Sequence, residues 1–411
     1  MRIVNYYFRF RRPSKADRKQ TEKELILAKK DKYDWIIKLV LMLFFLWLFL
    51  LSIKLLGEVF KHYFSDNTAD MIKNATDDPL VSFFIGILTT AIIQSSSSTT
   101  SIIVAFVGAG TISFNNAIPM VMGANIGTSV TGIIVSFGQV KNKLEFHRSF
   151  AAAVVHDNFN WFSVLLFLPL EIMTGFIGKS ATFLTNVFVG GSGVKFNSPL
   201  DMVVKSAAKS IESSVSGLFG CPITEHVIAG KASHYPVYNG LLLTVMIILS
   251  LALLFVSLNY MSSIMKKILI GKFERIIHKF VFNNMITSFL FGLIFTISVQ
   301  SSSVTISLIV PLVGAGILTL EQIFPYAVGA NIGTTITGIL AAMVTGNPSG
   351  ISIALVHTLF NIFGAAVFIP LKKLPIYTAK WFSYKVRENR LWAVGFLLIM
   401  FFILPLLFIF V

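Results

Sequence analysis

The sequence has little charge for its length and almost no cysteine. Only 13% of its 411 residues are Asp, Glu, Lys or Arg, which is about half the share found in an average soluble domain. The one cysteine, Cys221, excludes an intramolecular disulfide and a metal centre built from several cysteines. The chain also has no GxxxxGKS or GxxxxGKT loop, the phosphate-binding motif of many ATPases. Neither an ordinary soluble fold nor ATP hydrolysis is indicated.

Hydrophobic residues are plentiful instead: they make up 55% of the chain, and the mean hydropathy is +0.77. The runs at 41–51, 241–258 and 391–411 lie in segments that contain the roughly 20 apolar residues needed to cross a bilayer. The net charge of +15 comes from basic residues clustered between such segments. The positive-inside rule explains this pattern better than nucleic-acid binding does. We therefore predict an all-α polytopic membrane protein that has the lipid bilayer, and no nucleic acid, as a partner.

Charge is scarcest in two stretches that resemble each other. QSSSST at 94–99 returns as QSSSVT at 300–305, and GANIGT at 123–128 returns at 329–334, so both motifs recur after 206 residues. The segments 94–133 and 300–339 are identical at 22 of 40 positions. A duplicated polar motif inside hydrophobic sequence is typical of transporters whose site lies between two inverted-topology repeats.

The charge of the loops predicts a topology in which the second repeat begins on the opposite side of the membrane from the first. The acidic loop 57–79 is expected outside, and the basic loop near Lys141 inside. This order places the N-terminus in the cytoplasm and the C-terminus outside. The expected segments are a basic cytoplasmic tail at 1–34, a span at 35–56, a first repeat with a following interfacial segment at 80–190, an extracytoplasmic linker at 191–238, a span at 239–262, a second repeat with its interfacial segment at 281–390, and a last span at 391–411.

The serine motifs are expected to interrupt their helices. Buried polar groups in a membrane need partners, and consecutive Ser and Thr hydroxyls point in all directions around a helix, so they cannot all bond to their own backbone. A broken helix exposes N–H groups at a positive helix end, which favours an anion such as phosphate. The alternative is that small residues merely let helices pack closely. That alternative is preferred for the GAG triplets at 108–110 and 314–316, but not for the two QSSS strings.

The absence of charge around these motifs predicts a co-transported cation. Between 79 and 140 there is no Asp, Glu, Lys, Arg or His, and between 285 and 346 there is only Glu321. Moving a phosphate dianion into a neutral, dry site would be prohibitive. The substrate is therefore either uncharged or accompanied by cations. Hydroxyl and carbonyl oxygens at the ends of half-helices suit sodium.

Asp157 is the one acid inside a predicted apolar span, in the third segment of the first repeat. A carboxylate there costs about 2.5–3.5 kcal/mol or more, so a function is expected. Cation binding is preferred over a structural ion pair with Arg148 or His147. In the second repeat Thr358 takes its place. The i, i+4 pairs His156/Asn160 and His357/Asn361 each share one face of a helix. They are expected to pack and to form hydrogen bonds rather than to bind a metal, because no third ligand accompanies them.

Together these motifs resemble the type II sodium–phosphate cotransporters. The residues that carry the likeness are the two QSSS strings, the two GANIGT motifs and the segment VHDNFNW at 155–161. The resemblance implies phosphate contacts from Gln94, Ser95, Ser96, Ser97, Gln300, Ser301, Ser302 and Ser303. It implies sodium ligands near Gln139, Asp157, Asn160, Thr334 and Thr337, with supporting roles for Asn125, Thr128 and Asn331.

The same resemblance implies electrogenic transport, because family members with an aspartate at the position of Asp157 move net charge. The short linker with one cysteine suggests a bacterial homologue in the inner membrane. We thus expect a symporter for inorganic phosphate that takes sodium as co-substrate and needs no cofactor. The alternatives are a sodium symporter for another oxyanion or small carboxylate, and a serine-lined anion channel. An enzyme is the least favoured class, and the oligomeric state is left open.

Overall fold

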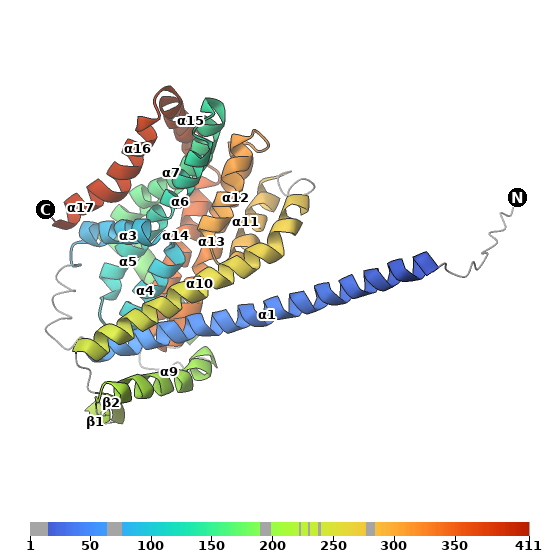
Figure 1. Ribbon diagram of the computed structural model, residues 1–411. Helices are drawn as coiled ribbons and strands as arrows, with labels where there is room; N and C mark the ends of the chain where they lie inside the picture. Colours follow the sequence, from blue (N-terminus) through green and yellow to red (C-terminus); the bar gives the residue numbers. More distant parts are fainter. Residues whose placement is uncertain are drawn as a thin grey trace, which may run out of the picture.

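The computed structural model describes residues 15–63, 76–189, 199–221, 223–228, 231–236, 240–276 and 284–410, and these form an almost wholly helical molecule (Figure 1). Within these ranges seven helical segments are long and apolar enough to cross a membrane. This confirms the predicted all-α polytopic class. The linker between the halves adds one small antiparallel hairpin, formed by β1 (Ile223–Ile228) and β2 (Lys231–Pro236).

Two long helices, α1 (Lys15–Tyr63) and α10 (Gly240–Ile276), pack against each other along one face of the molecule (Figure 1). Their apolar parts, Ile36–Lys61 and Gly240–Met265, correspond to the spans predicted at 35–56 and 239–262. Helix α1 begins well before its span, so part of the predicted polar tail is helical. The linker contains the amphipathic helix α9 (Pro199–Leu218), which packs on α1.

An ion-pair cluster fixes α9 to α1. Lys54 Nζ lies 3.1 Å from Glu58 Oε1 on its own helix and 2.9 Å from Asp201 Oδ1 on α9. All three side chains are at most a quarter exposed. A partly buried charge is costly unless it is paired, and Asp201 lies in the first turn of α9, where a negative charge is favourable. The cluster thus explains why α9, whose charged residues would otherwise favour solvent, packs against α1.

The two repeats fold into matching sets of helices. The first comprises α3 (Pro79–Ile93), α4 (Ser96–Ala109), α5 (Phe114–Gly127), α6 (Ser129–Ser136), the short η1 (Phe137–Gln139) and α7 (Lys143–Thr174). The second comprises α11 (Met285–Val299), α12 (Ser302–Gly314), α13 (Leu320–Thr345) and α14 (Pro348–Phe368). The single helix α13 therefore corresponds to α5 and α6 together, which form one span in the first repeat.

The helix break predicted at the serine motifs is confirmed, and it lies just before most of the serines. Gln94 ends α3 in the left-handed conformation (φ 57°, ψ 26°), and Ser95 caps the start of α4. Gln300 ends α11 with the same angles, and Ser301 caps α12. Each arm has 13 to 15 residues, or about 20 Å, which is shorter than the roughly 30 Å hydrocarbon core. Each pair is therefore a hairpin of half-helices.

Glycines of the GANIGT motifs hold these hairpins at backbone contact with the next helix. A Cβ placed on Gly123 would lie 2.0 Å from the carbonyl oxygen of Phe83, and one on Gly329 would lie 2.1 Å from that of Phe289. Gly86 and Gly292 form a second matched pair. Small residues of this kind let membrane helices approach closely. In the GAG triplets, Gly108 packs on Thr345 as predicted, whereas Gly110 and Gly316 are needed for positive φ at helix ends.

The serine-bearing arms exchange partners between the repeats. Helix α4 of the first repeat packs on α13 and α14 of the second, while α12 packs on α6 and α7 of the first. The helices that follow each repeat do the same: α8 (Phe176–Val189) packs on α14, and α15 (Lys373–Glu388) packs on α7. Reciprocal packing places both hairpin ends in the centre of the molecule.

The last span, Leu391–Phe410, consists of α16 (Leu391–Leu398), a π-helical turn (Ile399–Ile403) and α17 (Leu404–Phe410). Its end packs on α3, and most of its surface faces outward, as expected for a helix in contact with lipid. Val411, the last residue of the span predicted at 391–411, lies outside the described ranges.

Candidate functional site

The ends of the two hairpins meet at Ser97 and Gln300. Ser97 Oγ donates to the backbone oxygen of Gln300 at 3.3 Å and shares a hydrogen bond with Thr334 Oγ1 at 3.1 Å. Thr337 Oγ1 donates to Gln300 Oε1 at 2.6 Å. The structure thus brings together two predicted phosphate-contacting residues and two predicted sodium ligands.

Both hairpin ends contain an uncommon backbone conformation. Gln94 and Gln300 are the two non-glycine residues with positive φ among those that the structure describes. The left-handed region costs an L-residue about 1–2 kcal/mol, and such strain gathers at functional sites. Within the described chain, the strain is thus confined to equivalent positions of the two QSSS motifs.

The first turns of α4 and α12 offer backbone N–H groups at this centre. Ser95 Oγ accepts a hydrogen bond from Ser98 N at 3.2 Å, and Ser301 Oγ accepts one from Val304 N at 3.3 Å. These caps use the third N–H group of each helix, so the first two remain without a partner inside the helix. Two positive helix ends with free donors form a suitable environment for an anion.

A buried His–Asn cluster joins α7 of the first repeat to α13, the GANIGT helix of the second. His156 Nε2 lies 2.6 Å from Asn331 Oδ1, and Asn331 Nδ2 donates to Asn160 Oδ1 at 2.7 Å. Because Asn331 Oδ1 is the acceptor, His156 Nε2 carries the proton. The expected shared face of His156 and Asn160 is confirmed.

The second repeat forms the reciprocal cluster around Asn125. His357 Nε2 lies 3.3 Å from Asn125 Oδ1, and Asn361 Nδ2 donates to the same oxygen at 3.2 Å. The two clusters are connected, since Asn160 Nδ2 also donates to the backbone oxygen of Asn125 at 3.1 Å. Both supporting asparagines, Asn125 and Asn331, therefore hold the repeats together. The hydrogen-bonding role predicted for both histidines is confirmed.

Asp157 is fully buried, and neither of its carboxylate oxygens has a hydrogen-bond partner among the described residues. The hydroxyl of Ser129 lies next to this carboxylate, but outside hydrogen-bonding geometry. The alternative of an ion pair with Arg148 is not observed; a guanidinium nitrogen of Arg148 lies beside Gly316 instead. A buried carboxylate without partners is costly unless it is protonated or binds a cation. Its donor oxygens fit a hard cation such as sodium.

Further unpartnered oxygens occur in the same repeat. The hydroxyls of Thr90, Ser129 and Thr131 are buried and have no hydrogen-bond partner in the described structure. Ser129 and Thr131 were not predicted to belong to the site. The repeat spacing of 206 residues could have pointed to them, because Thr131 is the counterpart of Thr337, a predicted sodium ligand.

Gln139 lies away from the other predicted sodium ligands. Its Nε2 donates to the backbone oxygen of Pro311 at 3.2 Å, near the end of α12 that is remote from the serines. Pro311 lies nine helical positions after Ser302, which is about 13 Å along the helix. Its Oε1 lies 1.9 Å from where a Cβ of Gly314 would be, so a side chain at that position would displace the Gln139 amide.

The remaining predicted residues differ in exposure. Gln94 is exposed, whereas its counterpart Gln300 is half-buried and hydrogen-bonded. Ser96 and Ser302 are buried, while Ser303 is half-buried. Thr128 Oγ1 donates to the backbone oxygen of Ala124 at 3.1 Å, which stabilises the junction between α5 and α6. The glutamine of the second motif is thus more enclosed than that of the first, whereas Ser303 is more exposed than its buried counterpart Ser97.

Known proteins share these elements. The chain matches the family described as Na+/Pi-cotransporter over residues 48–190 and 253–401, which include both hairpins, both GANIGT helices and Asp157. The chain belongs to the Na+/Pi-cotransporter family. The match leaves out α9 and the β hairpin between the halves.

Several named relatives of this family cover most of the chain. "Sodium-dependent phosphate transport protein 2A" of Rattus norvegicus is 33% identical over 90% of this chain and 67% of its own length. The 2A protein of Ovis aries is 34% identical over 95% of this chain and 70% of its own length. "Sodium-dependent phosphate transport protein 2B" of Homo sapiens is 33% identical over 90% and 64%, respectively. No solved structure matches the chain.

Proposed function

We propose that this protein is a secondary active transporter that imports inorganic phosphate together with sodium ions. The observation that carries the proposal is the contact between Ser97, in the first turn of α4, and Gln300, which directly precedes the cap of α12, in the same core as the unpartnered carboxylate of Asp157. The first feature suits an anion and the second suits a cation. The names of the relatives, which are sodium-dependent phosphate transport proteins, support the same pair of substrates.

The phosphate is held between the two hairpin ends. The free N–H groups at the starts of α4 and α12, together with the serine hydroxyls, supply several donors for its oxygens. The proposed contacts come from Gln94, Ser95, Ser96, Ser97, Gln300, Ser301, Ser302 and Ser303. Because none of these residues is charged, the site does not bind a dianion strongly by itself. Sodium therefore binds first and adds the positive charge that the protein lacks.

The sodium sites use the oxygens around this centre. Thr334 adjoins the end of the first hairpin at Ser97, and Thr337 adjoins the end of the second at Gln300. Asn160 Oδ1 has one lone pair left after its bond with Asn331. Asp157, with Ser129 beside it, provides a further site that is close to electroneutral once occupied. Sodium at Asp157 makes the loaded carrier more positive, so transport is electrogenic. Gln139 acts at a separate position on the path of the sodium ions, near the end of α12 that is remote from the serines.

The two repeats are related by inversion in the plane of a bacterial inner membrane, with the N-terminus in the cytoplasm. The exchange of partners between α4 and α12, and the reciprocal contacts of Asn125 and Asn331, support a two-fold relation between the repeats. The charge of the loops supports the inversion. With the site on this axis, small movements of one half against the other would expose it alternately to each side.

Uptake of labelled phosphate into proteoliposomes tests the proposal. An inward sodium gradient should drive phosphate above its outside concentration, and an equal potassium gradient should not. Arsenate, which has the same shape and charge, should compete, whereas sulfate and succinate should not. Uptake that merely equilibrates with either cation would favour the anion channel, and competition by succinate would favour a carboxylate carrier.

A further inference from the structure

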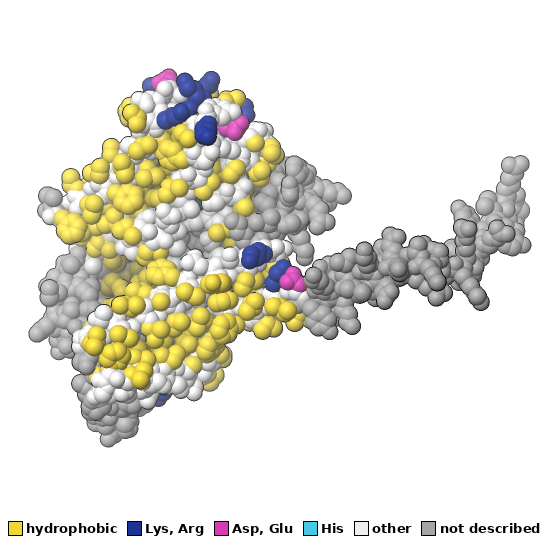
Figure 2. Space-filling model, in the orientation of Figure 1, with side chains coloured by type: hydrophobic (Ala, Val, Ile, Leu, Met, Phe, Trp, Pro, Cys, Tyr) yellow, Lys and Arg dark blue, Asp and Glu magenta, His cyan; other side chains and the backbone are white. Residues whose placement is uncertain are grey.

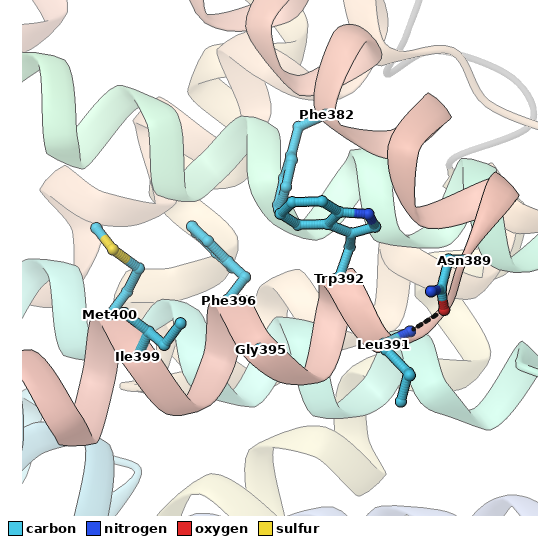
Figure 3. A pocket seen from close by; sticks show the side chains of 8 residues that line it. All are labelled: Phe382, Asn389, Leu391, Trp392, Gly395, Phe396, Ile399 and Met400. Atoms are coloured by element: carbon cyan, nitrogen blue, oxygen red, sulfur yellow. Dashed lines mark hydrogen bonds between the residues drawn. The ribbon is translucent and has the colours of Figure 1, made fainter.

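A groove of about 450 Å³ lies between α15 and the last span, away from the transport site. Of the eight described residues that line it, Asn389 alone is polar. Trp392, Phe396 and Met400 are four residues apart on α16 and the turn that follows, and Figure 3 shows them on the side that faces Phe382. The groove is therefore apolar along its length and polar at the end where α15 meets α16.

The groove exists because the two helices diverge and because one lining position has no side chain. Asn389 Oδ1 accepts a hydrogen bond from Leu391 N at 2.9 Å and so fixes the turn between the helices. The rings of Phe382 and Phe396, with centroids 4.9 Å apart, form its floor. Gly395 leaves the middle open: a Cβ built there would meet no other atom within 4 Å.

Basic residues are frequent in the segment that contains Asn389, at the polar end. The segment 372–390 contains Lys372, Lys373, Lys380, Lys385, Arg387 and Arg390 against the single acid Glu388, six minus one, which gives a net charge of +5. Lys380 is paired with Glu321, whereas Arg387 and Arg390 have no acidic partner among the described residues. Figure 2 shows Lys and Arg gathered at the top of the molecule, where Figure 1 places α15, above a hydrophobic lateral surface.

Aromatic residues mark the same level of the membrane. Tyr377, Trp381, Tyr384 and Trp392 are each more than half exposed. Exposed Trp and Tyr are typical of the boundary between lipid chains and water. The polar end of the groove thus lies at headgroup level, and its apolar part continues along the span Leu391–Phe410 into the lipid.

We propose that this groove holds one acyl chain of an anionic phospholipid whose headgroup contacts Arg387 and Arg390. An apolar channel that ends in unpaired positive charge at the membrane boundary matches a molecule with an apolar chain and an anionic head, and basic pockets at such positions bind anionic headgroups. A second copy of the chain fits less well, because a two-fold axis through this surface would bring two strongly basic segments together.

Native mass spectrometry of the full chain tests the assignment. The purified protein would be exchanged into detergent that contains equal amounts of phosphatidylglycerol and phosphatidylcholine. The wild type should retain one phospholipid and prefer phosphatidylglycerol about tenfold or more, since each basic residue near the surface contributes about 1 kcal/mol. Equal retention of the two lipids would overturn the proposal.

Two variants separate the chain from the headgroup. Gly395→Leu should fill the groove and abolish lipid retention, while helix propensity keeps the fold at least as stable. Gly240→Leu, at the exposed start of α10, is the matched control and should retain lipid normally. The double change Arg387→Gln and Arg390→Gln should keep a lipid but lose the preference for phosphatidylglycerol. Unchanged lipid retention in Gly395→Leu would contradict the proposal. A wild-type protein that forms a dimer and shows no preference between the lipids, together with a Gly395→Leu variant that is monomeric, would contradict it too.

Discussion

The two repeats have the same motifs at the same spacing, but their polar side chains are satisfied differently. In the second repeat the hydroxyls of Thr296, Thr335 and Thr337 donate to Thr305 Oγ1, the backbone oxygen of Ile332 and Gln300 Oε1. Their counterparts in the first repeat, 206 residues earlier, are Thr90, Ser129 and Thr131, and all three are buried without a partner. Asp157 follows the same pattern, since Thr358 in its place donates to its own helix backbone at 3.0 Å.

This difference indicates that the two repeats have different roles in ion binding. Packing is symmetric, because the same glycines bring the helices together in both halves. Hydrogen bonding is not: these threonine hydroxyls have partners within the second repeat, whereas the equivalent hydroxyls and the Asp157 carboxylate of the first repeat are buried without one. A cation bound between Asp157 and the neighbouring Ser129 would give both of these side chains a partner, which is why we place the additional sodium in the first repeat.

The largest expected effect tests the symmetric part of this comparison. Gly123→Ala and Gly329→Ala should both reduce stability severely, by about 3 kcal/mol or more, because each new methyl group would overlap a backbone oxygen. Gly132→Ala is the control, since its nearest neighbour would be 3.5 Å away. Thermal unfolding monitored in detergent measures all three. A large loss in only one of the two equivalent variants would show that the packing is not symmetric.

The next effect concerns the hairpin ends. Ser97 is buried and bonded to Gln300 and Thr334, whereas its counterpart Ser303 is only half-buried. Ser97→Ala should therefore lower the initial rate of phosphate uptake about tenfold or more, since a hydrogen bond to a charged ligand contributes about 1.5–3 kcal/mol. Ser303→Ala should lower it less. The reverse order would contradict the contact geometry.

A smaller effect separates the unpartnered hydroxyls from the satisfied ones. Ser129→Ala should raise the sodium concentration needed for half-maximal uptake about threefold to tenfold, because a neutral oxygen ligand contributes about 1 kcal/mol. Thr335→Val removes the equivalent hydroxyl of the second repeat, which bonds to its own helix, and should leave sodium dependence unchanged. Equal shifts in both variants would remove the distinction between the repeats.

The smallest effect compares the two His–Asn clusters. The contact of His156 with Asn331 is 2.6 Å long and that of His357 with Asn125 is 3.3 Å. His156→Ala should therefore cost more stability than His357→Ala, with both losses in the range of about 1–3 kcal/mol. Unfolding in denaturant would measure the difference. A greater loss in His357→Ala would indicate that distance does not set the strength of these contacts.

Local chemistry could be predicted from the sequence better than the contacts between repeats. The break at the QSSS motifs and the shared face of His156 and Asn160 follow from the behaviour of one helix, and both are confirmed. The exchange of partners between α4 and α12 depends on how the halves close, which no single segment determines. The location of Gln139 beside Pro311 depends on the same closure.

Two further features of the structure could not be predicted from the sequence, for different reasons. The amphipathic helix α9 lies in a linker whose polar composition resembles that of a loop, and the ion pair with Lys54 that docks it joins residues 147 positions apart (201 minus 54). The lack of partners for Ser129 and Thr131 is visible only when all neighbouring atoms are placed. Comparing equivalent positions of the two repeats identifies Ser129 and Thr131 as candidate ligands, but it does not show whether their hydroxyls have hydrogen-bond partners.

The central claim is that the first repeat holds an additional sodium ion at Asp157, and the ratio of charge to phosphate tests it most directly. Labelled phosphate uptake and membrane current would be measured in the same proteoliposomes for the wild type and for Asp157→Gly. We predict that the wild type moves net positive charge inward with each phosphate, and that Asp157→Gly transports phosphate with little or no current. The same charge per phosphate in both proteins would contradict the account.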